Sequence, residues 1–126
     1  MVFGKTNKNH IVTRNIIVYI AGLYSTGDVD INIQTARQVA IKVWEAGFTA
    51  ICPHLNTAHF EKDCKCKYED YIEGDLEIVK RCDCILMLPA WRESKGAKKE
   101  YLWACENQMP VFEKIESLKE YYDYWE

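Results

Sequence analysis

The stretch NIIVYIAG, Asn15 to Gly22, decides the fold class, because it combines a continuous apolar run with a terminating glycine. β-Branched and apolar side chains fill successive positions instead of alternating with polar ones, which is typical of a strand buried on both faces. The apolar run, 16–23, is too short to span a bilayer. It therefore predicts a central strand of a parallel sheet.

The segment after this strand has the pattern of an amphipathic helix. Asp30 is expected to cap a helix that continues through Ala46 and ends at Gly47, a residue type that commonly terminates helices. The expected inner face of this helix consists of Ile33, Ala36, Ala40, Val43 and Trp44.

The rest of the chain continues to alternate between strand and helix patterns. The expected elements are a strand at 48–52, a loop at 53–66, a helix at 67–80, a strand at 84–88, a helix from Ser94 and a strand at 109–112. This alternation predicts an α/β fold: an open doubly wound, flavodoxin- or Rossmann-like parallel sheet of about four to five strands with helices on both faces. Right-handed crossovers favour the strand order 2-1-3-4. Ligands of such sheets bind beyond the carboxyl ends of the strands, here at 22–28, 53–59 and 89–96.

Composition restricts the classes of protein and partner. The chain of 126 residues fits a single domain, 1–126, with a core of about 15–113 and a polar, aromatic tail at 114–126. A formal net charge of -3 gives no basis for binding nucleic acid or an anionic membrane. The N-terminus lacks an apolar leader, so we expect a cytoplasmic protein (host cytoplasm if phage-encoded) with reduced cysteines.

A carboxylate lies on the inner face of the helix that begins at Ser94. Helical spacing places Glu100 on one stripe with Ala97 and Ala104. The lysines of this helix, Lys95, Lys98 and Lys99, mostly face away from that stripe. The pattern therefore predicts a buried glutamate.

The helix at 67–80 repeats this feature, because Asp75 shares a stripe with apolar and aromatic side chains, namely Tyr71, Ile72, Ile78 and Val79. Burial raises a carboxyl pKa, and a second carboxylate nearby separates the two pKa values. Such a pair suits an acid and a nucleophile that act on a glycosidic bond. Two structural carboxylates that accept backbone hydrogen bonds fit the same pattern.

Three segments resemble the nucleoside 2-deoxyribosyltransferase superfamily, in particular its small bacterial and phage branch. They are VYIAGLYS at 18–25, Gly74-Asp75-Leu76 followed by RCDCILMLP, and WRESKGAKKE at 91–100. The superfamily includes the deoxynucleoside 5′-monophosphate N-glycosidases. The resemblance extends over about residues 16–112 and depends on the order and spacing of the segments.

The resemblance implies specific roles for residues of this chain. Glu100 matches the nucleophile that attacks C1′ of deoxyribose, Tyr19 matches the residue that orients it, and Asp75 matches the acid that handles the proton of the leaving base. Ser94, Gly96 and Ala97 match the segment that holds the 5′ end of the sugar. Further expected substrate contacts are Gly22, Leu23, Tyr24, His54, Asn56 and Trp91. The implied ligand is a small-molecule nucleoside or nucleotide, with no cofactor, and the implied assembly is a homodimer or larger homo-oligomer.

The residues favour a nucleoside 5′-monophosphate as the ligand, although they leave the 5′ group of the substrate open. Transferases of free nucleosides usually have aspartate where this chain has Ser94, whereas a serine at a helix N-terminus suits a phosphate. Against a phosphate, the loop LYSTGDVD has no arginine and carries Asp28 and Asp30, although Ser25 and Thr26 offer hydroxyl donors.

Two alternative functions are also compatible with the sequence. The same pocket would serve a binding module that holds a nucleotide or a nucleotide-derived signal without turnover. A zinc-stabilised domain would use the ligand types at Cys52, His54, His59, Cys64 and Cys66, whose spacing is not that of a standard finger, so no metal is expected. The tail KEYYDYWE is expected either to cross a neighbouring subunit or to pack on its own domain.

Overall fold

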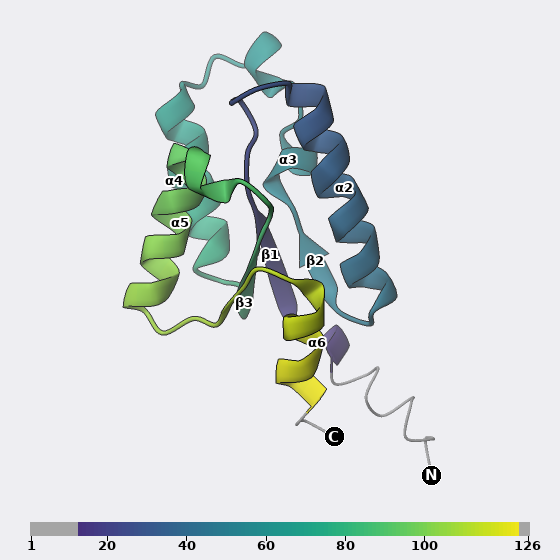
Figure 1. The fold of residues 1–126 in the computed structure, drawn as a ribbon. Helices are drawn as coiled ribbons and strands as arrows, with labels where there is room; N and C mark the ends of the chain where they lie inside the picture. The colour runs from purple at the N-terminus through teal and green to yellow at the C-terminus, as the bar shows by residue number, and fades with distance from the viewer. Residues whose placement is uncertain (1–12, 124–126) are drawn as a thin grey trace.

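The protein, described by a computed structural model over residues 13–123, has an α/β fold with one parallel sheet (Figure 1). Its described strands are β1 (Ile17–Ala21), β2 (Thr49–Ile51), β3 (Cys84–Met87) and β4 (Val111–Phe112). The strand order is β2-β1-β3-β4, and every pairing is parallel. The predicted fold class and the predicted strand order are therefore both confirmed.

β1 is buried on both faces, as its uninterrupted apolar run predicts. Successive side chains of a strand point to opposite faces of the sheet. Val18 and Ile20 accordingly join one hydrophobic cluster, while Tyr19 and Ala21 join another. Tyr19 lies in register with Ile51 of β2 and Ile85 of β3, so the strand positions its side chain at the centre of the sheet.

Helices cover both faces of the sheet, in agreement with a doubly wound architecture (Figure 1). The described helices are α2 (Val29–Glu45), α3 (Pro53–Asn56), α4 (Tyr68–Val79), α5 (Lys95–Glu106) and α6 (Ile115–Asp123), with short 3-10 turns at Phe60–Lys62 and Trp91–Glu93. Buried residues of α2 and α6 belong to the cluster of Val18, whereas those of α4 and α5 belong to the cluster of Tyr19. Tyr19 therefore faces the two helices that carry Asp75 and Glu100.

Two details of the first helix differ from the prediction. Its N-cap is Asp28 instead of Asp30, because the Asp28 carboxylate accepts a hydrogen bond from the Ile31 amide at 3.1 Å. Trp44 is 46% exposed, so its predicted place on the inner face is wrong; its ring stacks under the Arg14 guanidinium at 5.2 Å. The predicted terminator Gly47 has a φ of 96°, which explains why glycine is needed there.

Two segments predicted without regular structure contain helical turns. The loop 53–66 holds α3 and the 3-10 turn at Phe60–Lys62. Most of the polar tail forms α6, in which Leu118 and Tyr122 are buried against the domain's own core, the Tyr122 ring contacting Phe48. This part of the tail therefore packs on its own domain, while 124–126 lie outside the described residues.

The described residues also bear on the membrane and the cysteines. Within residues 13–123, no helix has both the length and the apolar character needed to cross a bilayer. All six cysteines are free thiols, two of them buried.

Candidate active site

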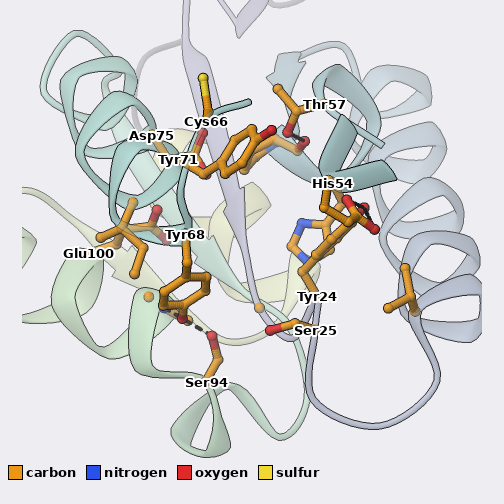
Figure 2. Close-up of a pocket in the computed structure, with 17 residues that line it drawn as sticks. Tyr24, Ser25, His54, Thr57, Cys66, Tyr68, Tyr71, Asp75, Ser94 and Glu100 are labelled. Atoms are coloured by element: carbon orange, nitrogen blue, oxygen red, sulfur yellow. Dashed lines mark hydrogen bonds between the residues drawn. The ribbon is translucent and has the colours of Figure 1, made fainter. Parts of the chain in front are cut away.

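A cavity of about 350 Å³ lies at the carboxyl ends of β1 and β2, against the first turns of α4 and α5 (Figure 2). This is the edge of the sheet at which the strand order predicts a ligand. The residues that line it are Gly22, Tyr24, Ser25, Val29, Pro53, His54, Thr57, Glu61, Cys66, Tyr68, Tyr71, Ile72, Asp75, Ser94, Gly96, Ala97 and Glu100. The cavity is thus walled by α4 and α5 on one side and by the loops after β1 and β2 on the other.

Glu100 is the most deeply buried acid of the cavity, only 6% exposed. It lies with Ala97 and Ala104 on the inner face of α5, as its stripe predicts, while Lys95, Lys98 and Lys99 are exposed. The hydroxyl of Tyr19 donates a hydrogen bond to Glu100 Oε2 over 2.6 Å, a length typical of a strong bond to a carboxylate. Tyr19, on the central strand, therefore holds one oxygen of the Glu100 carboxyl group, and this group also lines the cavity.

Asp75 lines the same cavity from α4, the helix packed beside α5 (Figure 2). Burial raises the pKa of Asp75 to about 6. Burial likewise raises the pKa of Glu100 to about 8, with the hydrogen bond from Tyr19 acting in the opposite direction and the charge of Asp75 adding to the rise. Between these two pH values the pair holds one proton in total, which lies chiefly on Glu100, the group with the higher pKa.

The N-terminus of α5 opens onto the cavity. Ser94 caps the helix, its Oγ accepting the Ala97 amide at 3.1 Å, as predicted. The amides of Lys95 and Gly96, in the first turn, have no acceptor within the helix. Gly96 and Ser94 both line the cavity, so this end of the site offers N–H donors and one hydroxyl.

Gly22 is required at the cavity wall by the packing of two strand ends. A Cβ at this position would lie 2.6 Å from the Cβ of Leu88, a buried residue directly after β3. Such a contact is impossible without a shift of the backbone. The glycine therefore permits the close approach of the chain after β1 to the chain after β3.

The loop wall of the cavity carries His54 and Tyr24, whose rings make an edge-on contact at 5.8 Å. His54 is buried, and burial lowers its pKa, so the imidazole is neutral at pH 7. Its Nε2 contacts the carbonyl of Leu23, which can only accept, so Nε2 carries the proton. Leu23 thus shapes the site through its backbone carbonyl, although it does not line the cavity.

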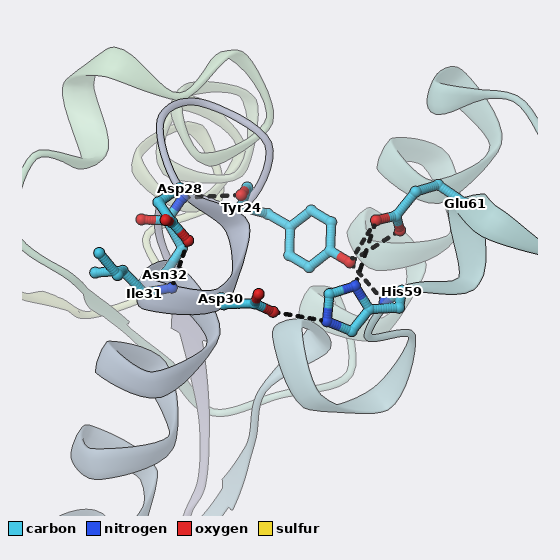
Figure 3. Close-up of polar contacts among 7 residues, drawn as sticks. All are labelled: Tyr24, Asp28, Asp30, Ile31, Asn32, His59 and Glu61. Carbon is cyan, nitrogen blue, oxygen red and sulfur yellow. Dashed lines mark hydrogen bonds and ion pairs between the residues drawn. The ribbon is translucent and has the colours of Figure 1, made fainter.

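A polar network joins the loop after β1 to the loop after β2 (Figure 3). The Tyr24 hydroxyl donates to Glu61 Oε1 at 2.9 Å and accepts the His59 amide at 2.7 Å. Asp30 pairs with His59 Nε2 at 3.0 Å, and Asn32 donates to the Tyr24 carbonyl at 2.8 Å. These contacts hold Tyr24 over the side of the cavity opposite Glu100.

Two predicted substrate contacts lie away from the cavity lining. Asn56 is exposed at the end of α3. Trp91 is buried in the core, where its ring lies 4.5 Å from that of Tyr101 and its indole N–H donates to Glu113 at 3.2 Å. The left-handed backbone of Ala90, with φ 62°, begins the turn that directs Trp91 inward. Their predicted substrate roles have no support from this placement.

Several residues that line the cavity are not among the predicted substrate contacts. Tyr71 shares the stripe of Asp75, so helical spacing was a usable signal for its position in the cavity. Thr57, Glu61 and Cys66 come from a segment without periodicity, and no pattern in the sequence marks them. Tyr68, the first residue of α4, falls at a helix end, where spacing gives little guidance.

The ligand types considered for zinc separate in space. His54 contacts Leu23 and Cys52, whereas His59 pairs with Asp30. Among residues 13–123, no group of three or more His, Cys, Asp or Glu side chains is arranged to hold a metal ion.

The structure is thus an α/β domain with a cavity at the switch point of its sheet. The chain belongs to the family described as "Domain of unknown function (DUF4406)", whose pattern it matches over residues 16–113. No curated protein matches the chain.

One solved structure with a similar fold is that of a 2-deoxyribosyltransferase from the psychrotolerant bacterium Bacillus psychrosaccharolyticus. The two chains share 19% sequence identity with a TM-score of 0.55, over 75% of this chain and 69% of that one. At this identity the similarity establishes the shared fold, which is the fold that the resemblance predicted.

Proposed function

We propose that this protein cleaves or exchanges the N-glycosidic bond of a 2′-deoxynucleoside or its 5′-monophosphate, with Glu100 as the nucleophile. The observation that carries the proposal is the hydrogen bond from Tyr19 to the buried Glu100, in a cavity that Asp75 also lines. The shared fold with a 2-deoxyribosyltransferase supports it.

In the first half of the proposed reaction, a Glu100 oxygen forms a bond to C1′ while the bond from C1′ to the base nitrogen breaks. Protonated Asp75 gives its proton to the leaving base. The second Glu100 oxygen stays bonded to Tyr19, so the attacking oxygen has a fixed direction. A 2′-deoxy sugar passes through an oxocarbenium-like state, which a close carboxylate stabilises.

In the second half, a water or a second base attacks C1′, and the ester bond to Glu100 breaks. Asp75 takes the proton of the attacking water or base, which restores the pair. Hydrolysis and transfer therefore share one intermediate and differ in the group that resolves it. With pKa values of about 6 for Asp75 and about 8 for Glu100, the single proton of the pair lies chiefly on Glu100 between these pH values. The proposed reaction therefore uses the minor form in which Asp75 is protonated and Glu100 is ionised.

The charge of the cavity favours a substrate with a free 5′-hydroxyl. The lining includes three carboxyl groups, on Glu61, Asp75 and Glu100, and no Lys or Arg among the described residues. The free amides of the first turn of α5 and the Ser94 hydroxyl are weaker partners for a phosphate dianion than a guanidinium. We therefore expect nucleosides to react faster than their monophosphates.

The experiment is chromatography of the free base released from a panel of deoxynucleosides and deoxynucleoside monophosphates, with and without an acceptor base. The proposal expects release by the wild-type protein and none by Glu100→Gln. A dependence on the acceptor would identify a transferase. Tight binding of intact nucleosides without release from any donor would instead support a binding module.

Assembly into a homodimer or larger oligomer is a further part of the proposal, taken from the resemblance alone. Sedimentation velocity of the purified protein measures it directly. A single monomeric species at micromolar concentration would contradict it.

A further inference from the structure

The chain contains two Cys-x-Cys sequences, whose thiols differ in burial and in contacts. Cys82 and Cys84 belong to hydrophobic clusters on opposite faces of the sheet, so their sulfurs point apart. Burial raises the pKa of both, to about 11 and about 12. This pair therefore presents little thiolate at neutral pH.

Cys64 and Cys66 instead lie together in the loop directly before α4. The Cys66 amide donates to the Cys64 sulfur at 3.4 Å, so the two residues are in direct contact. Cys66 is exposed and also lines the cavity, next to Tyr71 (Figure 2). The pair is thus accessible, in mutual contact, and part of the wall of the candidate active site.

The surroundings of the pair make its two thiols unequal. The Tyr71 hydroxyl beside Cys64, and the amide and thiol of Cys66, lower the pKa of Cys64. The neighbouring Cys64 raises the pKa of Cys66. One nucleophilic thiol beside a protonated one is the arrangement that thiol–disulfide exchange requires.

We propose that Cys64 and Cys66 form a redox-active dithiol that low-molecular-weight disulfides convert to an intramolecular disulfide at the cavity wall. The Cys64 thiolate attacks one sulfur of the small disulfide, a mixed disulfide forms, and one small thiolate leaves. Cys66 then loses its proton and attacks the Cys64 sulfur, so the second small thiolate leaves. The protein loses two electrons and two protons, and the small disulfide gains them as two thiols.

Such a bridge would be readily reversible. Residues two apart span at most about 7 Å between Cα atoms, close to the upper limit for a disulfide. Exposed or strained disulfides have the higher reduction potentials and are the labile ones. Because Cys66 directly precedes the N-cap of α4, the helix of Asp75, the bridge links redox state to the shape of the cavity.

The test treats the reduced full-length protein with glutathione disulfide at pH 7, quenches with acid at timed intervals, and measures intact and peptide masses. We expect a species lighter by two hydrogens, mapped to the peptide with Cys64 and Cys66, that glutathione reverses. Oxidation at Cys64 should be at least roughly tenfold faster than at the exposed, solitary Cys105.

Matched variants separate the pair from general thiol reactivity. Cys66→Ser should accumulate the mixed disulfide at Cys64, because the resolving thiol is absent, whereas Cys82→Ser should behave as the wild type. Only mixed disulfides in the wild type, or equal reaction at Cys105, would overturn the proposal. None of these readouts depends on glycosidic activity.

Discussion

The cavity contains two tyrosine–glutamate hydrogen bonds on opposite walls. Tyr19 donates to Glu100 at 2.6 Å inside the domain, and Tyr24 donates to Glu61 at 2.9 Å on the loop side. Glu100 is 6% exposed and burial raises its pKa to about 8. Glu61 is exposed and its pKa is lowered, chiefly by a hydrogen bond from its own amide and also by that from Tyr24.

The difference shows how burial changes the role of the same chemical pair. In water, a hydrogen bond from a phenol adds little to the stability of a carboxylate. The exposed Glu61 therefore acts as a hydrogen-bond acceptor that holds Tyr24 in place. In the core, the charged form of Glu100 loses its hydration, and Tyr19 provides one of its few stabilising contacts. Ionisation of Glu100 is therefore unfavourable in the free protein, and the developing positive charge of the sugar would stabilise the ionised form.

The largest expected effect separates the two glutamates by activity. Glu100→Gln keeps the volume and the acceptor for Tyr19 but removes the nucleophile, so base release should fall by roughly 10³-fold or more. The rate of base release by Glu61→Gln should stay within about threefold of the wild-type rate, because this substitution changes only an exposed hydrogen-bonding side chain. Chromatography of the released base under steady-state conditions measures the rates of both variants. Equal losses of activity in the two variants would contradict the separate roles of the two tyrosine–glutamate pairs.

The second effect concerns stability and its dependence on pH. A carboxyl whose pKa is raised in the folded state stabilises at low pH, and this contribution is lost as pH rises from the unfolded value of about 4.5 towards 8. Glu100→Gln should therefore increase the free energy of unfolding at pH 8 by about 2 to 4 kcal/mol, with little change at pH 4.5.

Urea unfolding of both variants at the two pH values checks this stability prediction. Glu61→Gln is the matched control and should give no gain at pH 8, because the Glu61 pKa is lowered instead of raised. A stability gain for Glu100→Gln that is independent of pH would point to better packing instead of a lost charge.

The third effect tests the hydrogen bond of the buried pair. Base release should have a bell-shaped pH dependence between about 6 and about 8, because one proton must remain on the pair. Tyr19→Phe removes the bond that lowers the pKa of Glu100, so the alkaline limb should move to higher pH and kcat should fall about 10- to 100-fold. An unchanged pH profile would show that Tyr19 supports only the packing.

The smallest effect belongs to the exposed pair. Tyr24→Phe removes the hydroxyl that joins Glu61 to the His59 amide, and thermal unfolding should show a loss of about 1 kcal/mol. The pH dependence of base release should keep its shape, in contrast to Tyr19→Phe. A shift of the alkaline limb by Tyr24→Phe would contradict the assignment of separate roles.

The sequence could predict those parts of the site that depend on periodicity. Helical spacing identifies Glu100 between Ala97 and Ala104, and the uninterrupted run of β1 indicates that both of its faces are covered. The pairing of Tyr19 with Glu100 followed from a family resemblance, because no local pattern relates residues 81 positions apart.

The remaining parts depend on tertiary contacts. Asp28 and Asp30 are both good caps by residue type, and the pairing of Asp30 with His59 is visible only in three dimensions. The indole ring of Trp91 is of a type that often stacks on a base, but the turn at Ala90 directs this side chain into the core. Glu61 lies in the short 3-10 turn at Phe60–Lys62, and neither its place in the cavity lining nor its contact with Tyr24 has a signal in the local sequence.

The central claim, that Glu100 becomes covalently bonded to the sugar, is tested most directly by mass spectrometry after rapid acid quenching of the protein with a reactive deoxynucleoside. The account predicts a deoxyribosyl adduct on the peptide that contains Glu100, which disappears on longer incubation and is absent from Glu100→Gln. Base release with an adduct on another residue, or undiminished release by Glu100→Gln, would contradict it.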